Sequence, residues 1–314
     1  MKLVFCGTPE FAVPTLQAVL DAGHEVALVL TQPDRPAGRK MELQVPAVKR
    51  LAMESGLEVL QPLKIKTNDE LRARLEAIQP DAILVVAYGR IIPQWMLDLP
   101  QFGNINLHGS LLPKYRGAAP VQWAVANGEA ETGVTTMRLD AGLDTGDVLL
   151  ERRLPIGPDA TAAELFGSLA EIGAPLMLET LAGLEAGTVV RKPQDHAGAT
   201  LAPILTREDG RMDLTEQTAQ EAYNRWRGFY PWPGAHAMFR GKRFLVHRMH
   251  VEPVDSGLAA GQLDWSGGSL LVGAAESTTL VLDEVQLEGK QQLSGMDFVR
   301  GFQLKQGENL DGTA

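Results

Sequence analysis

The opening of the chain alternates an apolar strand, a helix and a second apolar strand, and this order restricts the fold more than any other feature. Met1–Gly7 and Glu25–Thr31 are compact apolar runs. Pro9, which lies between them, suits the first turn of a helix that we expect to reach Ala22. Two buried strands joined by a helix form a βαβ unit, and Asp81–Val86 is typical of a central parallel strand. The sequence therefore predicts an α/β fold built on a parallel sheet.

The turn after the first strand does not have the pattern of a dinucleotide-binding site. That site needs a Gly-x-Gly-x-x-Gly turn, because only glycines let the backbone approach a pyrophosphate closely. Of the three positions, only the one at Gly7 is a glycine here. We interpret this turn as structural and expect no nicotinamide dinucleotide to bind.

Polar side chains stand at the ends of two predicted strands and in a glycine-rich turn. Asn106 and His108 are two residues apart, and on a strand this spacing places both on one face. Tyr88 and Gly89 follow the preceding strand, at the carboxyl end where open α/β sheets bind ligands. Alone, an Asn-x-His pair is more often structural, and an aspartate such as Asp144 more often caps its loop. Together with the Ser-Leu-Leu-Pro loop, an amide, an imidazole and a carboxylate are the groups needed to transfer a carbonyl-level group.

The second half of the chain changes character. Glu131–Leu139 and Val148–Pro155 are expected to form a hairpin or an extended pair that covers the sheet edge, and Ala162–Ala186 has helical periodicity. Gly187–Thr206 lacks a regular pattern and is expected to be a linker. From about Arg207, short apolar runs alternate with glycines, and this spacing predicts a small β-barrel.

Composition limits the compartment and the metal chemistry that we expect. The sequence has no apolar run long enough to span a bilayer and no signal-peptide layout at its start. Its single cysteine, Cys6, excludes an intramolecular disulfide framework. No cluster of histidines and cysteines has the spacing of metal ligands. We therefore expect a cytoplasmic protein without a metal ion.

The net charge of −10 argues against binding nucleic acid by bulk electrostatics, so a polyanion would have to meet a local basic patch. One such patch is the long loop Gln32–Leu43, which carries Arg35, Arg39 and Lys40. It is either a solvated loop or an arm that folds onto an anionic partner.

A second basic stretch, Arg225–His250, contains no acidic residue and interleaves aromatic with basic side chains, among them Arg240, Lys242 and Arg243. Such a pattern on a β-barrel can hold a nucleic-acid backbone, or it can be a solvated face over an aromatic core. For Trp232, which stands between two prolines, we expect packing.

Seven motifs spread over nearly the whole chain occur together: Gly7-Thr-Pro-Glu-Phe11, Gln32-Pro-Asp-Arg-Pro-Ala-Gly-Arg39, Val86-Ala-Tyr-Gly89, Asn106-Leu-His-Gly-Ser-Leu-Leu-Pro113, Arg116-Gly-Ala-Ala-Pro120, Leu143-Asp-Thr-Gly-Asp147 and Phe229-Tyr-Pro-Trp-Pro233. With this set the chain resembles the methionyl-tRNA formyltransferase family. The His-x-Ser-Leu-Leu-Pro run is shared with all folate-dependent formyl transferases, including those of glycinamide ribonucleotide and of amino sugars. The Arg-Gly-Ala-Ala-Pro and Arg-Pro-Ala-Gly-Arg motifs are more particular to the tRNA enzymes.

The resemblance implies a Rossmann-like, 10-formyltetrahydrofolate-binding catalytic domain over residues 1–189, a linker over 190–206 and an OB-like β-barrel over 207–314 that helps to hold tRNA. It implies that the catalytic residues are Asn106, His108 and Asp144. The residues implied at the folate site are Tyr88, Gly89, Ser110, Leu111, Leu112 and Pro113. Those implied to bind tRNA are Arg35, Arg39, Lys40, Arg240, Lys242 and Arg243.

The reaction that the resemblance implies moves the formyl group of 10-formyltetrahydrofolate to the α-amine of methionine on initiator tRNA. Asn106 and His108 would donate hydrogen bonds to the charged formyl oxygen, and Asp144 would favour protonated His108 and accept the proton from the amine. We expect a monomer with no membrane partner. The alternatives are formylation of a nucleotide-linked amino sugar, and a folate-controlled RNA-binding protein without turnover.

Overall fold

The computed structural model describes residues 1–37, 42–253 and 256–310, and the chain folds into two compact units. Unit 1 consists of Met1–Val121, Glu131–Pro155 and Glu164–Pro203. Unit 2 consists of Gln122–Ala130, Ile156–Ala163 and the chain from Ile204 onward. Two short segments that lie between parts of unit 1 in the sequence therefore belong to the second unit. The functional boundaries at 189, 206 and 207 stay a prediction.

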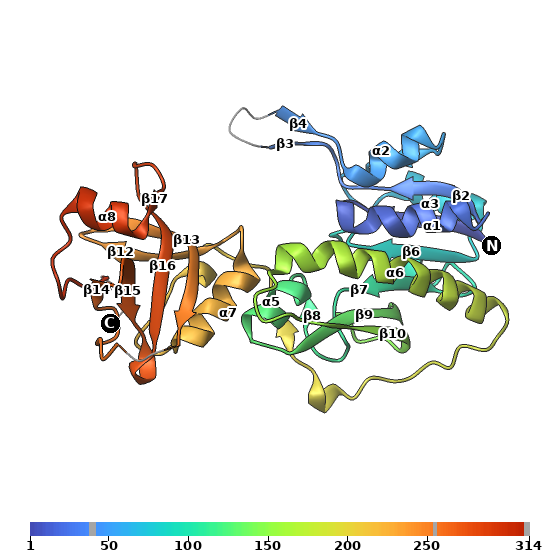
Figure 1. The fold of residues 1–314 in the computed structure, drawn as a ribbon. Helices are drawn as coiled ribbons and strands as arrows, with labels where there is room; N and C mark the ends of the chain where they lie inside the picture. The colour runs from blue at the N-terminus through green and yellow to red at the C-terminus, as the bar shows by residue number, and fades with distance from the viewer. Residues whose placement is uncertain (38–41, 254–255, 311–314) are drawn as a thin grey trace. The chain divides into compact units, whose positions relative to one another are not determined.

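Unit 1 is built on a seven-stranded sheet in the order β10-β9-β7-β6-β1-β2-β5 (Figure 1). The five strands from β7 to β5 run parallel, and β9 and β10 form an antiparallel pair at one edge. This arrangement confirms the predicted parallel sheet and the extended pair at its edge. The strands are β1 (Lys2–Gly7), β2 (Glu25–Leu30), β5 (Val59–Leu60), β6 (Ala82–Val86), β7 (Asn104–His108), β9 (Glu131–Arg138) and β10 (Val148–Pro155).

Helices cover this Rossmann-like sheet. They are η1 (Glu10–Ala12), α1 (Val13–Asp21), α2 (Ala47–Glu54), α3 (Asp69–Ile78), α4 (Gln94–Leu97) and α6 (Ala162–Glu185). The long helix α6 packs on β7 and β9: a Cβ at Gly173 would lie 2.6 Å from Leu107, and the hydroxyls of Thr136 and Thr180 are 2.7 Å apart. Leu107 thus faces α6, and alternation along the strand turns its two neighbours to the opposite face.

By length and composition alone, α6 would be able to cross a membrane, contrary to our expectation from the sequence. Half of its apolar window is buried inside the protein, as in the core helix of many soluble proteins. Its alanine, leucine, isoleucine and methionine residues raise the mean hydropathy, and part of this apolar surface packs on β7 and β9.

Two short strand pairs in unit 1 were not predicted from the sequence. The predicted loop Gln32–Leu43 contains β3 (Arg35–Ala37) and β4 (Glu42–Gln44), which pair antiparallel. In addition, β8 (Arg116–Gly117) pairs in parallel with β11 (Leu201–Ala202). Most of the segment that we expected to be a linker therefore packs into unit 1, because its backbone bonds to the loops of the sheet.

Unit 2 contains an antiparallel sheet in the order β12-β13-β16-β15-β14, with β17 pairing to β16. Its strands are β12 (Ala235–Phe239), β13 (Lys242–Glu252), β14 (Leu263–Ser266), β15 (Ser269–Gly273), β16 (Thr279–Leu287) and β17 (Leu293–Ser294). Its helical elements are α5 (Pro120–Ala126, of which the part from Gln122 belongs here), η3 (Glu208–Gly210), α7 (Ala219–Phe229), η4 (Ala275–Ser277) and α8 (Gly295–Phe302).

The helix α7 packs against β12, β13 and β16 of unit 2. It begins with a capping box in which Thr218 and Glu221 satisfy each other's backbone N–H groups. Gly228 brings it against α5, because a Cβ there would lie 2.6 Å from the backbone of Gln122 and Ala126. One expectation is wrong: Trp232 does not pack in this core, since 56% of it is exposed.

Candidate active site

The strand β7 presents Asn106 and His108 on the face of the sheet opposite to α6. Asn106 pairs in register with Val85 of β6, and His108 pairs with Thr135 of β9. Both side chains are largely buried, with 9% of Asn106 and 5% of His108 exposed. Because the two residues stand at the carboxyl end of a parallel strand, they occupy the edge where this class of sheet binds ligands.

The hydrogen bonds of His108 fix which ring nitrogen carries a proton. Its Nε2 lies 2.9 Å from the carbonyl oxygen of Tyr115, and a carbonyl can only accept. Nε2 therefore donates, and Nδ1 is left to the site. Nδ1 lies 3.8 Å from Oδ2 of Asp144, a distance that suits an ion pair with the protonated ring. The imidazole and the carboxylate predicted from the sequence are thus brought together.

Asp144 is held in a backbone conformation that residues with side chains rarely adopt. Its φ is +51°, and its Oδ2 accepts a hydrogen bond of 2.9 Å from the backbone N–H of Gly117. Within the same loop, Oδ1 of Asp140 accepts from the N–H of Gly142 and from the hydroxyl of Thr145. These bonds order the loop and aim its carboxylate at His108.

The Ser-Leu-Leu-Pro loop is braced from inside. Ser110 is fully buried, and its Oγ donates to the carbonyl of Lys114 at 2.7 Å. Thr135 donates to the carbonyl of Ser110 and accepts from the N–H of Leu112. The hydroxyl of Ser110 therefore orders the loop, and a direct role in holding folate stays a prediction for Ser110, Leu111, Leu112 and Pro113.

At the end of β6, the side chain of Tyr88 packs in the core, and its backbone carbonyl bonds to neighbouring segments. The ring of Tyr88 is 1% exposed and packs in the core, where burial raises the pKa of its phenol above the usual range. Its carbonyl accepts from Nε2 of Gln32 at 3.0 Å and from the hydroxyl of Thr8 at 3.3 Å. Gly89, with a φ of +76°, follows it. Gln32 was not predicted to lie here, because nothing in its spacing indicates a contact with Tyr88.

The basic residues predicted to bind tRNA differ in their surroundings. Arg35 is exposed on β3, whereas Arg39 and Lys40 lie outside the described residues. In unit 2, Lys242 is exposed, but Arg240 forms a bidentate ion pair with Glu308.

Two further arginines of the expected basic face also have partners. Arg243 contacts Nδ1 of His236 at 3.0 Å, and Arg248 lies 3.8 Å from Asp283. The face that is free of acids in the local sequence is therefore partly neutralised. Its acidic partners come from distant strands and from the C-terminal segment, which local composition does not reveal.

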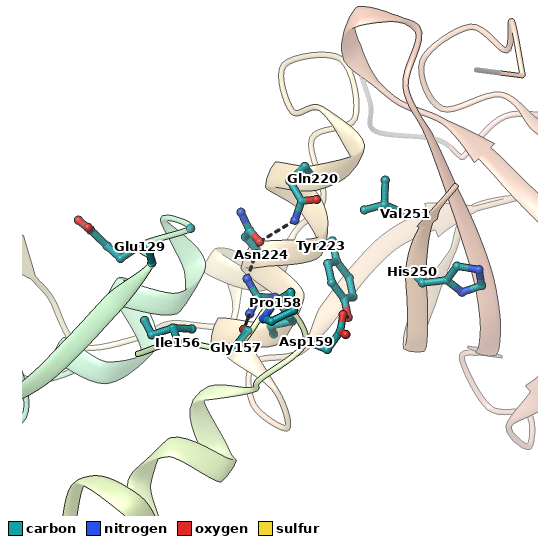
Figure 2. Close-up of a pocket in the computed structure, with 13 residues that line it drawn as sticks. Glu129, Ile156, Gly157, Pro158, Asp159, Gln220, Tyr223, Asn224, His250 and Val251 are labelled. Carbon is teal, nitrogen blue, oxygen red and sulfur yellow. Dashed lines mark hydrogen bonds between the residues drawn. The ribbon is translucent and has the colours of Figure 1, made fainter. Parts of the chain in front are cut away.

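A pocket of about 450 Å³ opens within unit 2 (Figure 2). None of the predicted site residues is among the described residues that line it. Tyr223 donates to Asp159, and the carboxamide oxygen of Asn224 accepts from Gln220 and Arg227. The polar groups of this pocket thus bond largely to one another. Across the described ranges, no group of three or more histidines, cysteines and acids is arranged to hold a metal ion.

The comparisons with known proteins agree with this geometry. Residues 1–181 match the family model described as formyl transferase, and residues 204–303 match the model of the formyl transferase C-terminal domain. Together with an imidazole and a carboxylate at the open edge of a parallel sheet, these matches define the class as the formyl transferases.

Two curated relatives show which family of formyl transferases this chain resembles. The chain is 62% identical over 304 residues to the methionyl-tRNA formyltransferase of Acidobacterium capsulatum, with 97% of each chain covered. It is 57% identical over 310 residues to the enzyme of that name from Koribacter versatilis, with 99% of this chain and 98% of that one covered. The chain therefore belongs to the methionyl-tRNA formyltransferase family.

Solved structures share the fold at low identity. A sugar 3N-formyl transferase, WlaRD, matches with a TM-score of 0.66 at 16% identity, covering 93% of this chain and 99% of that one. The N-formyltransferase of Helicobacter canadensis matches with a TM-score of 0.68 at 18% identity, covering 93% and 100%. These similarities show the fold alone, because the identities are low.

Proposed function

We propose that this protein transfers the formyl group of 10-formyltetrahydrofolate to the α-amine of methionine on initiator Met-tRNA in the cytoplasm. The observation that supports the chemistry most directly is the pairing of His108 Nδ1 with Asp144 Oδ2 at 3.8 Å, beside Asn106. The acceptor is supported by the relatives of 62% and 57% identity, which are named methionyl-tRNA formyltransferases.

The residues divide the reaction between them. Attack of the amine builds negative charge on the formyl oxygen, and each hydrogen-bond donor aimed at such an oxygen contributes about 3–4 kcal/mol. Asn106 donates through its amide. His108 has committed Nε2 to Tyr115, so it donates through Nδ1, and only when the ring is protonated. Asp144 stabilises that form and accepts the proton that leaves the amine, directly or through water. The bond from the formyl carbon to N10 of the folate then breaks, and the proton is passed to N10, so that tetrahydrofolate leaves as a neutral amine.

Folate would lie along the backbone at the end of β6 and against the loop from Ser110 to Pro113. Gly89, with its positive φ, leaves space for a ligand there: among the described residues, the one atom within 4 Å of an added Cβ is Nε2 of Gln32, at 3.8 Å. The tRNA would meet the arm that includes Arg35 and the sheet of unit 2, which we propose to be an OB-like barrel acting in a monomer. Lys242 and Arg243 are the candidates on that sheet, together with Arg240 if phosphate displaces Glu308.

The test offers 10-formyltetrahydrofolate with initiator Met-tRNA, or with a nucleotide-linked amino sugar, and follows the formyl group. We expect transfer to the tRNA alone. Replacing Asn106, His108 or Asp144 by alanine should each reduce turnover by about 100-fold or more while the protein stays folded. Preferred transfer to the amino sugar would contradict Met-tRNA as the acceptor. Binding of tRNA without transfer to either substrate would favour an RNA-binding protein.

A further inference from the structure

The segment after α6, expected to be a linker, lies across both loops of the active site. Lys192 forms a backbone bridge with Val148, next to the Asp144 loop. Thr200 accepts from the backbone N–H groups of Tyr115 and Arg116. The strand pair β8–β11 continues this contact. The segment 192–202 therefore ties the loop after His108 to the loop that carries Asp144.

Gln194 is the side chain at the centre of this segment, and only 8% of it is exposed. Its Nε2 donates to the carbonyl of Asp144 at 2.9 Å and to that of Gly146 at 2.7 Å. Its Oε1 accepts from the guanidinium of Arg116, from Nε at 3.1 Å and from a terminal nitrogen at 2.7 Å. All four bonds of the carboxamide are thus directed at the two loops.

Arg116 fixes the orientation of this carboxamide. A guanidinium can only donate hydrogen bonds, so the oxygen of Gln194 has to face it. The NH₂ group then necessarily faces the two carbonyls, which can only accept. Arg116 is itself 6% exposed and also contacts Nδ1 of His196 at 3.1 Å. The arrangement therefore has no alternative in which the amide is flipped.

These contacts surround Asp144, whose left-handed backbone is unfavourable for a residue with a side chain. A conformation of this kind is strained and persists only where neighbours enforce it. Gln194 holds the carbonyl side of Asp144, and the N–H of Gly117 holds its carboxylate. Arg116, acting through Gln194, thus holds the backbone of Asp144, and the adjacent Gly117 holds its carboxylate.

We infer that Gln194 is a positioning residue for formyl transfer, which holds the Asp144 loop so that the carboxylate meets Nδ1 of His108. The inference rests on the proposed role of Asp144. Displacing a reacting group by about 1 Å can reduce the rate by about 100-fold. Without Gln194, the loop is expected to sample other backbone conformations, and the carboxylate is expected to leave His108 in most of them.

The first test uses Gln194→Met, which keeps the volume but removes all four bonds, and Gln194→Glu, which keeps an acceptor for Arg116 and removes the donors. We expect kcat to fall by about 10- to 100-fold in both variants, with KM for each substrate within about threefold of the parent. Gln17→Met, at an exposed glutamine of α1 that bonds to Asp21, is the matched control and should leave kcat unchanged. An unchanged kcat in both Gln194 variants would overturn the inference.

The second test separates this role from a general structural one. If Gln194 acts through Asp144, Gln194→Met should lower the turnover of an Asp144→Asn protein by less than about twofold. The full effect in that background would show an independent action and overturn the inference.

The third test does not depend on activity. Amide hydrogen exchange in residues 141–147 should become faster in both Gln194 variants, while exchange in β6 stays at the parent rate. Unchanged exchange in the loop would overturn the inference. Should Asp144→Asn keep full turnover, the proposed catalytic role of Asp144 would fail, and the exchange measurement would still report whether Gln194 holds the loop.

Discussion

At the scale of single residues, the site depends on which polar atoms are already engaged. His108 uses Nε2 to hold the carbonyl of Tyr115, and this leaves one nitrogen for chemistry. The side chain of Ser110 likewise orders its own loop. The sequence predicted which residues meet, because alternation along β7 and the position of strand ends follow from the apolar runs. It did not predict how each atom is used, because that depends on Tyr115 and Gln194, which carry no pattern of their own.

The division of labour within the imidazole can be tested with His108→Gln. The glutamine amide can reach the position of Nε2 and keep the bond to Tyr115, but it has no group at Nδ1. We expect the free energy of unfolding to stay within about 1 kcal/mol of the parent. Turnover should fall by about 100-fold or more. Urea unfolding and single-turnover formylation measure the two effects, and near-parent turnover would contradict the role of Nδ1.

Glycine is required at position 117 because of the backbone conformation there, in addition to the N–H group that bonds to Asp144. Its φ is +125°, and an added Cβ would lie 2.5 Å from the carbonyl oxygen of Ala202. Gly117→Ala should destabilise the protein by about 1–3 kcal/mol and lower turnover, since the N–H that holds Asp144 shifts. Gly167→Ala is the control: it lies within α6 with open space around it, and should stabilise by about 0.5–1 kcal/mol. Thermal unfolding of both variants measures these two opposite changes in stability, and equal changes would contradict the role of Gly117.

Tyr223 should affect the alkaline side of the stability curve. Burial, and then its hydrogen bond to Asp159, raises the pKa of Tyr223 to about 12, whereas an unfolded tyrosine titrates near pH ~10. Because the folded state keeps its proton longer, the contribution is complete below about pH 10 and is lost as the pH rises toward about 12. Urea unfolding between these values should show a shallower decline for Tyr223→Phe than for the parent. If the free energy of unfolding fell equally with pH in the parent and in Tyr223→Phe, the titration of Tyr223 would not contribute to stability.

At the scale of elements, long apolar runs gave reliable predictions and short pairs did not. The strands of the unit 1 sheet and the helix α6 follow from runs of apolar residues or helical periodicity. By contrast, β8 and β11 are two residues each and are separated by more than eighty positions, so nothing local indicates their pairing. Tertiary contacts also decide the base of the β3–β4 hairpin, where Lys49 and Gln61 both bond to Asp34.

The hairpin gives a test of tRNA binding at this scale. Arg35 is exposed on β3, and the base beside it is anchored through Asp34. Arg35→Ala should weaken tRNA binding and reduce the slope of log affinity against log salt by about one, because one phosphate contact is lost. Folate binding should not change. Lys66→Ala, at an exposed lysine of the same unit, is the control, and an equal change there would remove the specific role of the hairpin.

At the scale of the whole molecule, unit 2 is not a continuous piece of chain. Phe229 of α7 packs edge-on against Trp123 at 5.2 Å between centroids, and Arg227 donates to the carbonyls of Gly157 and Ala160. Arg227 is 4% exposed, so without these acceptors its charge would be buried with fewer partners. Composition indicated a second domain from about residue 207 but gave no sign of its two earlier segments, because they are short and close neighbours of the sheet strands in sequence.

A fragment of residues 204–314 should therefore fold poorly. It lacks the partners of Phe229 and Arg227, and we expect its free energy of unfolding to fall by more than about 3 kcal/mol relative to the same unit in the full chain. Near-ultraviolet circular dichroism and urea unfolding would show this, with the full chain as the reference. A cooperative transition at the parent midpoint would contradict the three-segment description.

The same interleaving sets an order of events on the ribosome. Residues 122–130 and 156–163 are synthesised well before α7, which they contact, and the remaining chain takes on the order of ten seconds to emerge. During that interval Trp123 lacks its edge-on contact with Phe229. The core of unit 2 can form only after translation has nearly finished. The nascent chain therefore passes through a stage at which a chaperone could bind the segment that carries Trp123.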